Sequence, residues 1–149
     1  MGVQAIHHHK IFVSDMDRSI VFYRDLLGFE LMQDVVRENL PAYDQIMGYD
    51  DIKIRVVMMN VPGKPDNLIA LLQFLNPPIT SREQAISYVG TQALAVVVDN
   101  IDEEYNKLTE AGVRFQGPPV DIVRDGKLVA KANYLYDPDD MAIELYEMA

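Results

Sequence analysis

The sequence predicts an α+β fold built from two similar halves, each with the order strand–helix–strand–strand–strand. A helix in each half begins after an aspartate and ends at a glycine 13 residues later, from Asp15 to Gly28 and from Asp99 to Gly112. Aspartate caps helix starts, and glycine suits the left-handed position after a helix end. Because such matched spacing in two segments is the mark of an internal repeat, we expect one duplicated architecture.

Composition supports a small-molecule protein with a real core. The chain has 149 residues, of which 49% are hydrophobic and 24% charged, so we expect a single domain over residues 1–149. With no cysteine it has no disulfide, thiolate zinc site or thiol nucleophile, and it fits a cytoplasmic location. The net charge of −10 disfavours nucleic acid and anionic membranes as partners. No apolar run reaches the length of a membrane span.

The first half is predicted to contain three strands after its helix. After the helix we expect strands at Phe29–Val36 and Lys53–Val61, a turn at residues 62–65, and a last strand at Ile69–Phe74. The stretch Arg37–Asp51 is long and irregular, which is typical of a lid or cavity wall.

The second half matches it in order. We expect strands at Val113–Phe115 and Leu128–Tyr136, a turn at residues 137–140, and a last strand at Ile143–Met148. The first module therefore covers about 5–75 and the second about 91–149. The connector covers about 76–90, and Ser81–Ser87 within it is compatible with a short helix.

Strand alternation predicts which side chains share a face. One face is expected to carry Ile6, His8 and Lys10 from the first strand, Leu68, Ala70, Leu72 and Phe74 from the fourth, Ala93, Ala95 and Val97 from the fifth, and Ala142, Glu144, Tyr146 and Met148 from the last. The opposite faces are apolar and suit packing under the helices.

Four stretches resemble the vicinal oxygen chelate superfamily, whose members include glyoxalase I, bleomycin-resistance proteins and dioxygenases: IHHHKIFVSDMDRSIVFYRDLLGFEL, VPGKPDNLIALLQF, ALAVVVDNIDEEYNKLTEAGV and YLYDPDDMAIELYEM. The resemblance implies a glyoxalase-like fold, in which two βαβββ modules form a curled mixed sheet around a shared cavity. It also implies a divalent metal held by a His on the first strand and a Glu on the last strand of each half.

The residues of this chain match the four metal-binding positions of the superfamily only in part. The resemblance places His8 and Glu144 at two of the four positions, but Ala70 stands at the third, and at the fourth the repeat is ambiguous between Ala93 and Gln92. Alanine offers no lone pair, and a tight site needs about three protein ligands. No tightly held cofactor is therefore expected, although a divalent metal on His8, Glu144 and Gln92 stays open.

The surviving pair suggests acid–base chemistry. A His and a Glu in an apolar cavity can move a proton near neutral pH, so we expect His8 and Glu144 to be the catalytic residues of an isomerase, epimerase or lyase. The substrate is expected to be a small oxygenated hydrophobic molecule, and its binding residues to be Ala70, Leu72, Phe74, Ala93, Tyr134 and Tyr146.

Two other functions remain open at this point. One is a metal-dependent lyase or isomerase like two other members of the superfamily, glyoxalase I and methylmalonyl-CoA epimerase. The other is a protein that sequesters a drug or metabolite, as bleomycin-resistance members do. A homodimer is expected for any of these. The resemblance implies that modules pair either within one chain or between two chains, and both arrangements stay open.

Overall fold

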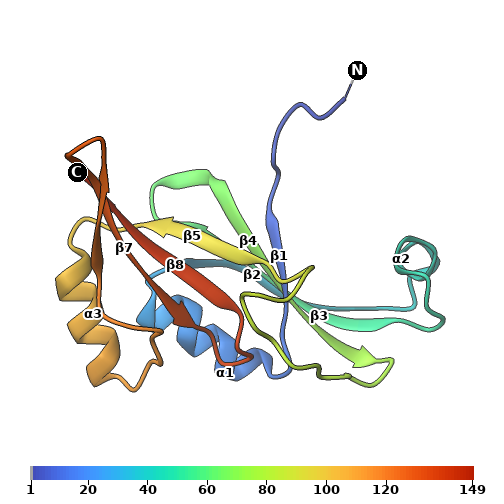
Figure 1. Ribbon diagram of the computed structural model, residues 1–149. Coiled ribbons are helices and arrows are strands. Elements are labelled where there is room, and N and C mark those ends of the chain that lie inside the picture. Colours follow the sequence, from blue (N-terminus) through green and yellow to red (C-terminus); the bar gives the residue numbers. More distant parts are fainter. Residues whose placement is uncertain (1) are drawn as a thin grey trace. The chain divides into compact units, whose positions relative to one another are not determined.

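The structure, a computed structural model, describes residues 2–149 and divides the chain into two compact units, Met1–Arg82 and Glu83–Ala149. The first unit contains β1 (His9–Phe12), α1 (Met16–Ile20), the π-helix η1 (Val21–Leu26), β2 (Glu30–Glu38), α2 (Pro41–Met47), β3 (Lys53–Val61) and β4 (Lys64–Asn76). Its four strands form one sheet in the order β1-β4-β3-β2, with β1 parallel to β4 and the other pairs antiparallel (Figure 1).

The second unit repeats this topology. It contains β5 (Ala93–Val97), α3 (Ile101–Glu110), β6 (Val120–Arg124), β7 (Lys127–Tyr136) and β8 (Ala142–Met148), and its sheet has the order β5-β8-β7-β6. Here too the first strand is parallel to the last, and the other pairs are antiparallel. The predicted βαβββ architecture of two mixed sheets is thus confirmed. Among the described strands, neither sheet closes into a barrel.

Backbone hydrogen bonds show which residues of the two units are equivalent. Where the chain leaves the first strand of each unit, the Val13 N–H donates to the Leu72 carbonyl (2.8 Å) and the Val98 N–H donates to the Tyr146 carbonyl (2.9 Å). One bond is therefore the counterpart of the other, and Val13 is equivalent to Val98.

The start of each helix is held by a side chain from the last strand of its own unit. The Met16 N–H at the start of α1 donates to Gln73 Oε1 of β4 at 2.8 Å, and the Ile101 N–H at the start of α3 donates to Glu147 Oε2 of β8 at 2.7 Å. The first amides of a helix have no partner within the helix, so each contact satisfies a donor that would otherwise be unpaired.

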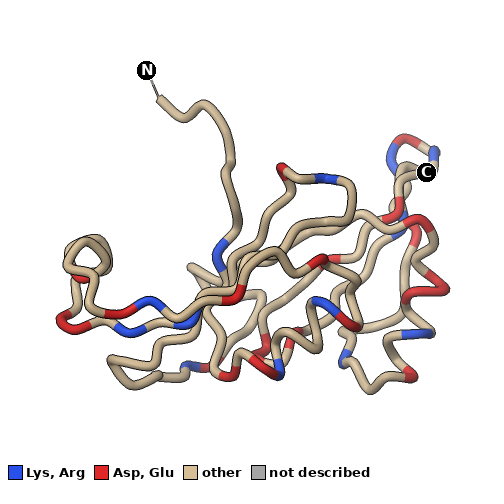
Figure 2. The backbone as a smooth tube through the Cα atoms, turned by 180° about the vertical axis from the view of Figure 1, so that it is seen from behind, with Lys and Arg blue, Asp and Glu red and all other residues tan. Residues whose placement is uncertain are grey.

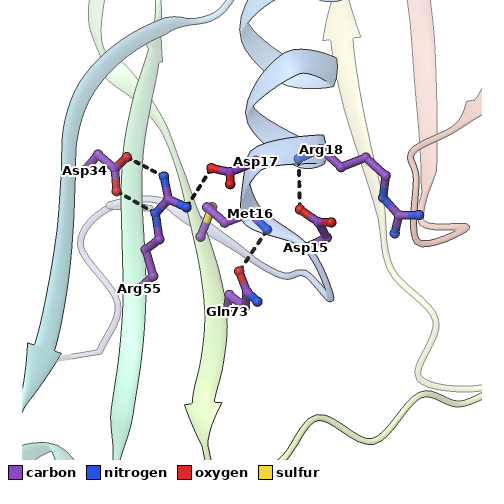
Figure 3. Close-up of polar contacts among 7 residues, drawn as sticks. All are labelled: Asp15, Met16, Asp17, Arg18, Asp34, Arg55 and Gln73. Atoms are coloured by element: carbon purple, nitrogen blue, oxygen red, sulfur yellow. Dashed lines mark hydrogen bonds and ion pairs between the residues drawn. The ribbon is translucent and has the colours of Figure 1, made fainter.

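A cation from the next strand holds the second residue of each helix. In the first unit Arg55 of β3 pairs with Asp17 of α1 and with Asp34 of β2, both at 2.7 Å (Figure 3). The hydrogen bonds from Arg55 hold the pKa of Asp34 below its usual value. In the second unit Lys131 of β7 pairs with Asp102 of α3. The two modules therefore share side-chain contacts as well as topology.

The first helix contains one residue more than the second. Met16 and Ile101 are equivalent and 85 positions apart, whereas Gly28 and Gly112, which follow the two helices, are 84 positions apart. The π-helical stretch Val21–Leu26 accommodates the difference, because an i→i+5 turn holds one residue more than an α-helical turn.

The predicted helix ends are confirmed at three of four positions. Asp15 caps α1 by accepting from the Arg18 N–H, and both Gly28 and Gly112 have positive φ angles. The cap of α3 is Asn100 instead of Asp99: its side chain accepts from the Glu103 N–H at 3.1 Å. The prediction of Asp99 counted the same number of residues back from the glycine in both helices. The second helix is one residue shorter than the first, so its cap lies one position later, at Asn100.

Replacing Asn100 by alanine should lower the free energy of unfolding by about 1 kcal/mol, because the Glu103 amide loses its cap. Urea unfolding followed by circular dichroism measures this loss. Asp99→Ala is the matched control and should change stability by less than about 0.5 kcal/mol. A larger loss for Asp99→Ala than for Asn100→Ala would contradict the assigned cap.

Four local predictions are wrong. The second-unit strand expected at Val113–Phe115 is only an isolated bridge between Phe115 and Leu135, and the strand is β6 instead. The stretch expected to be irregular contains α2, and Ser81–Ser87 forms no helix. β1 begins at His9, so His8 lies directly before the strand instead of on it.

Each unit has its core between its sheet and its main helix. In the first unit Ile11, Leu71 and Val57 lie side by side on three neighbouring strands and are at most 3% exposed. In the second, Ile143 and Leu145 of β8 and Ile101 and Leu108 of α3 are buried. Figure 2 shows acidic residues spread along both units. None of the helices in residues 2–149 could cross a membrane.

Candidate functional site

Strand register in the first unit places the predicted substrate-binding residues on one face of its sheet. Lys10 of β1 pairs with Ala70 of β4, and Phe12 pairs with Leu72. Residues paired across neighbouring strands point to the same side. Phe74 follows two positions after Leu72 and shares this face, which lies opposite the one that carries Leu71 and packs under α1.

The helix α2 covers part of this face. The cluster on the face consists of Ile52, Ile54, Ala70 and Leu72, with Tyr43, Met47, Val56, Met58 and Phe74 packed against it. Phe74 also stacks on Phe12, with ring centroids 6.1 Å apart, and meets Tyr49 edge-on at 6.0 Å. Two residues mark α2 in the sequence: Pro41 stands at its first turn, and Gly48 ends it with a positive φ.

His8 lies at the open end of β1. Continuing the alternation of β1 by one residue puts His8 on the same face as Lys10, whereas His9 lies on the face of Ile69. The His8 ring is half-buried, and its Nδ1 lies 2.7 Å from His7 Nδ1 in a hydrogen bond between the two rings. Desolvation lowers the pKa of His8 below 6.5, and the neighbouring His7, Lys10 and His9 lower it further.

We expect a measured pKa below 6.5 for His8 in the folded protein, from an NMR titration of its ring protons. The unfolded chain then binds a proton at His8 more readily than the folded chain does. Stability from this group is therefore present above the ordinary histidine pKa and is lost as pH falls through the lowered value. A His8 pKa above 6.5 would contradict the burial of its ring.

In the second unit Glu144 lies on the face of the sheet opposite α3. It stands in the middle of β8, paired with Ala95 of β5 on one side and with Tyr134 of β7 on the other. Tyr146, two residues further along β8, pairs with Val97 and Ala132 and shares the face. The predicted residues Glu144, Tyr134 and Tyr146 are thus brought together.

Towards β5, the surroundings of Glu144 are small and apolar. Ala93 pairs with Ala142 at the same face, and Ala93 and Ala95 are exposed while Ala142 is buried. Glu144 is half-buried, and no other side chain or amide among residues 2–149 forms a hydrogen bond or ion pair with its carboxylate. The carboxylate is therefore available to a ligand, and the neighbouring side chains of Ala93, Ala95 and Ala142 on this face are methyl groups.

The equivalences between the units decide which residue corresponds to His8. Since Val13 is equivalent to Val98, 85 positions on, His8 is equivalent to Ala93. Gln92 precedes β5, and alternation puts it on the opposite face from Ala93. Gln73 and Glu147 bind equivalent helix starts and are 74 positions apart, so β4 and β8 are offset by 74 positions. Ala70 and Glu144 are also 74 positions apart and are therefore equivalent.

This donor set fits a tightly held divalent metal poorly. The four equivalent positions hold one imidazole, one carboxylate and two methyl groups, and a tight site needs about three protein ligands. Within residues 2–149 no three His, Cys, Asp or Glu side chains are grouped so that they could hold a metal ion. His8 and Glu144 belong to different units, so their approach to each other stays a prediction.

Comparisons with known proteins agree with this architecture. The family model of the Glyoxalase/Bleomycin resistance protein/Dioxygenase superfamily matches residues 5–145. Uncharacterized protein YaeR of Escherichia coli (strain K12) is 30% identical over 147 residues, which are 99% of this chain and 98% of that protein. A 2-epi-5-epi-valiolone epimerase of Actinomyces sp is 27% identical over 153 residues, covering 99% of this chain and 81% of the epimerase.

Solved structures show the same fold. A glyoxalase family protein of Bacillus cereus superposes with a TM-score of 0.85 at 23% identity, covering 99% of this chain and 96% of that one. The trypanothione-dependent glyoxalase I of Leishmania major superposes with a TM-score of 0.66 at 20% identity, covering 97% and 87% of the two chains.

Proposed function

Because the chain belongs to the Glyoxalase/Bleomycin resistance protein/Dioxygenase superfamily, we propose that it is an enzyme that moves a proton at a carbon next to a carbonyl group. The reaction is an isomerisation, an epimerisation or an elimination on a small oxygenated molecule. Epimerisation is favoured among these, since a relative that spans the whole chain is named as an epimerase.

One observation carries this proposal. Of the four equivalent positions on the two sheets, only His8 and Glu144 have ionisable side chains, and both lie on apolar faces. Glu144 has a carboxylate with no partner among the described residues, and the pKa of His8 is lowered mainly by desolvation. An available base and a neutral imidazole are what proton transfer at neutral pH requires.

The proton steps balance with solvent water as the other proton source. The Glu144 carboxylate takes the proton from the carbon next to the carbonyl group, and the electron pair of that C–H bond moves to the carbonyl oxygen. The neutral imidazole of His8 then relays a proton to the opposite face of the carbon: one ring nitrogen gives its proton as the other takes one from water, and the electron pair returns from the oxygen to form the new C–H bond, which inverts the centre. Glu144 gives its proton to the hydroxide that remains, so both side chains return to their starting states. Tyr134, paired with Glu144, has a phenol that can donate to the developing oxyanion.

We also propose that this reaction does not depend on a tightly held metal. A metal in this fold would polarise the carbonyl group as a Lewis acid. His8 and Glu144 are the residues that would hold it, but Ala70 and Ala93 give it no further donor. The proposed reaction therefore takes no step through a metal.

Proton transfer to solvent tests the function directly. The protein is incubated in D₂O with a panel of small α-hydroxyketones and 2-substituted thioesters, and mass spectrometry measures deuterium at the carbon next to the carbonyl group. We expect enzyme-dependent deuterium incorporation in at least one compound. The chelator-treated protein should be equally active, and activity restored only by nickel, zinc or manganese would overturn metal independence. Tight binding of a panel member without exchange would indicate sequestration instead.

A further inference from the structure

We propose that Lys10 binds an oxyanion of the substrate, a carboxylate or a phosphate, and so restricts the substrates of the site to anionic compounds. This inference rests on the proposed function, because it names the substrate class for the same site. It adds a binding residue to the acid–base pair.

The position of Lys10 is the first argument. Lys10 lies in β1, opposite Ala70 and two residues after His8, on the face that carries Leu72 and Phe74. Ala70 is 1% exposed within the apolar cluster on this face, whereas Lys10 is exposed at the edge of the same face, so its ammonium is open to a ligand.

The charge around Lys10 is the second argument. The protein has 23 acidic against 13 basic residues, yet no acidic residue among positions 2–149 forms an ion pair with Lys10. Its neighbours on this face are His8 and Phe12 along β1, and Leu68, Ala70 and Leu72 along β4. The exposed ammonium of Lys10 therefore carries a charge that no acidic side chain among these residues neutralises, and a bound oxyanion would neutralise it through a charge-assisted hydrogen bond.

Lys10 also lies close to the acid–base pair. It stands two residues after His8, and alternation along β1 puts both side chains on the same face. An anion bound by Lys10 would therefore lie beside the group that exchanges the proton.

A structural explanation competes with this one. β1 is an edge strand of its sheet, and lysine on an edge strand opposes pairing with another sheet. That role requires only a charge pointing outward and predicts no specific binding of anions, so an anion-binding experiment separates the two explanations.

The test measures binding of two probes, pyruvate as a small carboxylate and inorganic phosphate, by NMR shifts of the β1 amides at about pH 7.5, where lysine is charged. The variants are Lys10→Gln, Lys10→Arg and the control Lys64→Gln. Lys64 is an exposed cation at the far end of β4, so its replacement changes the net charge equally. Losing one charged contact should weaken binding about tenfold in Lys10→Gln, while Lys10→Arg retains it and Lys64→Gln leaves it unchanged.

Each outcome decides the proposal. Binding of either probe that is lost only in Lys10→Gln supports it, and the stronger probe identifies the anion. Equal weakening in Lys64→Gln, unchanged binding in Lys10→Gln, or no shift with either probe at millimolar concentration would overturn it. The binding experiment measures no turnover, so its result can be interpreted even if the proton-exchange assay fails. Exchange of neutral ketones without anion binding would keep the proposed function and remove the role of Lys10.

Discussion

Replacing Glu144 by glutamine should lower the rate of proton exchange by a factor of about 10² to 10⁴, the usual contribution of a general base. Glutamine keeps the size of the side chain and cannot take a proton. The fold should be retained, because the Glu144 carboxylate has no hydrogen bond or ion pair with another residue in the described part of the chain. Deuterium incorporation measured at saturating substrate gives the loss, and unfolding in urea checks the fold.

Glu147→Gln is the matched control, since it removes the same charge three residues further along β8. Glu147 lies on the opposite face and accepts a hydrogen bond from the Ile101 amide. Glutamine can accept the same bond, as Gln73 does in the first unit. Exchange should therefore stay near the wild-type rate. A Glu144→Gln enzyme as active as the control would remove Glu144 from the reaction.

Leu71→Ala should lower the free energy of unfolding by about 3 kcal/mol, within the range for leucine cavities in tightly packed cores. Leu71 is 0% exposed and lies in β4 between Ile11 of β1 and Val57 of β3. Its removal leaves a space between the sheet and α1. Urea unfolding at constant pH measures the difference from the wild type.

Leu75→Ala, in the same strand, is the control for this substitution. Leu75 is 43% exposed, so its replacement should cost less than about 1 kcal/mol. If the two variants lost equal stability, the buried face of the sheet would not be the core of the first unit.

The repeat could be predicted because its signals are local. Asp15, Gly28 and Gly112 mark helix ends by their own backbone chemistry, and the structure confirms them. The register between the halves could not be fixed in this way, since a single π-helical turn changes helix length without changing its pattern of apolar residues. For this reason the repeat spacing predicts Asp99 as the cap instead of Asn100, and leaves both Gln92 and Ala93 as possible equivalents of His8.

The missed strand had a usable signal. β6 begins just after Gly117, Pro118 and Pro119. It ends at Asp125-Gly126. Both residues have a positive φ, which is the conformation of a two-residue hairpin turn.

The candidate site could also be predicted only in part. Alternation along β8 predicts that Glu144 and Tyr146 share a face, because a strand has a fixed period. The pairing of Tyr134 with Glu144 depends instead on the register between β7 and β8. The cover of Tyr43 and Met47 over Ala70 depends on tertiary packing, which no local pattern encodes.

The π-helical turn in the first unit confines a difference in length to one place. It takes up the additional amino acid locally, so the strands before and after it keep the same order as in the second unit. Removing one amino acid from Val21–Leu26 should therefore give an uninterrupted α-helix as long as α3 without a change in the sheet.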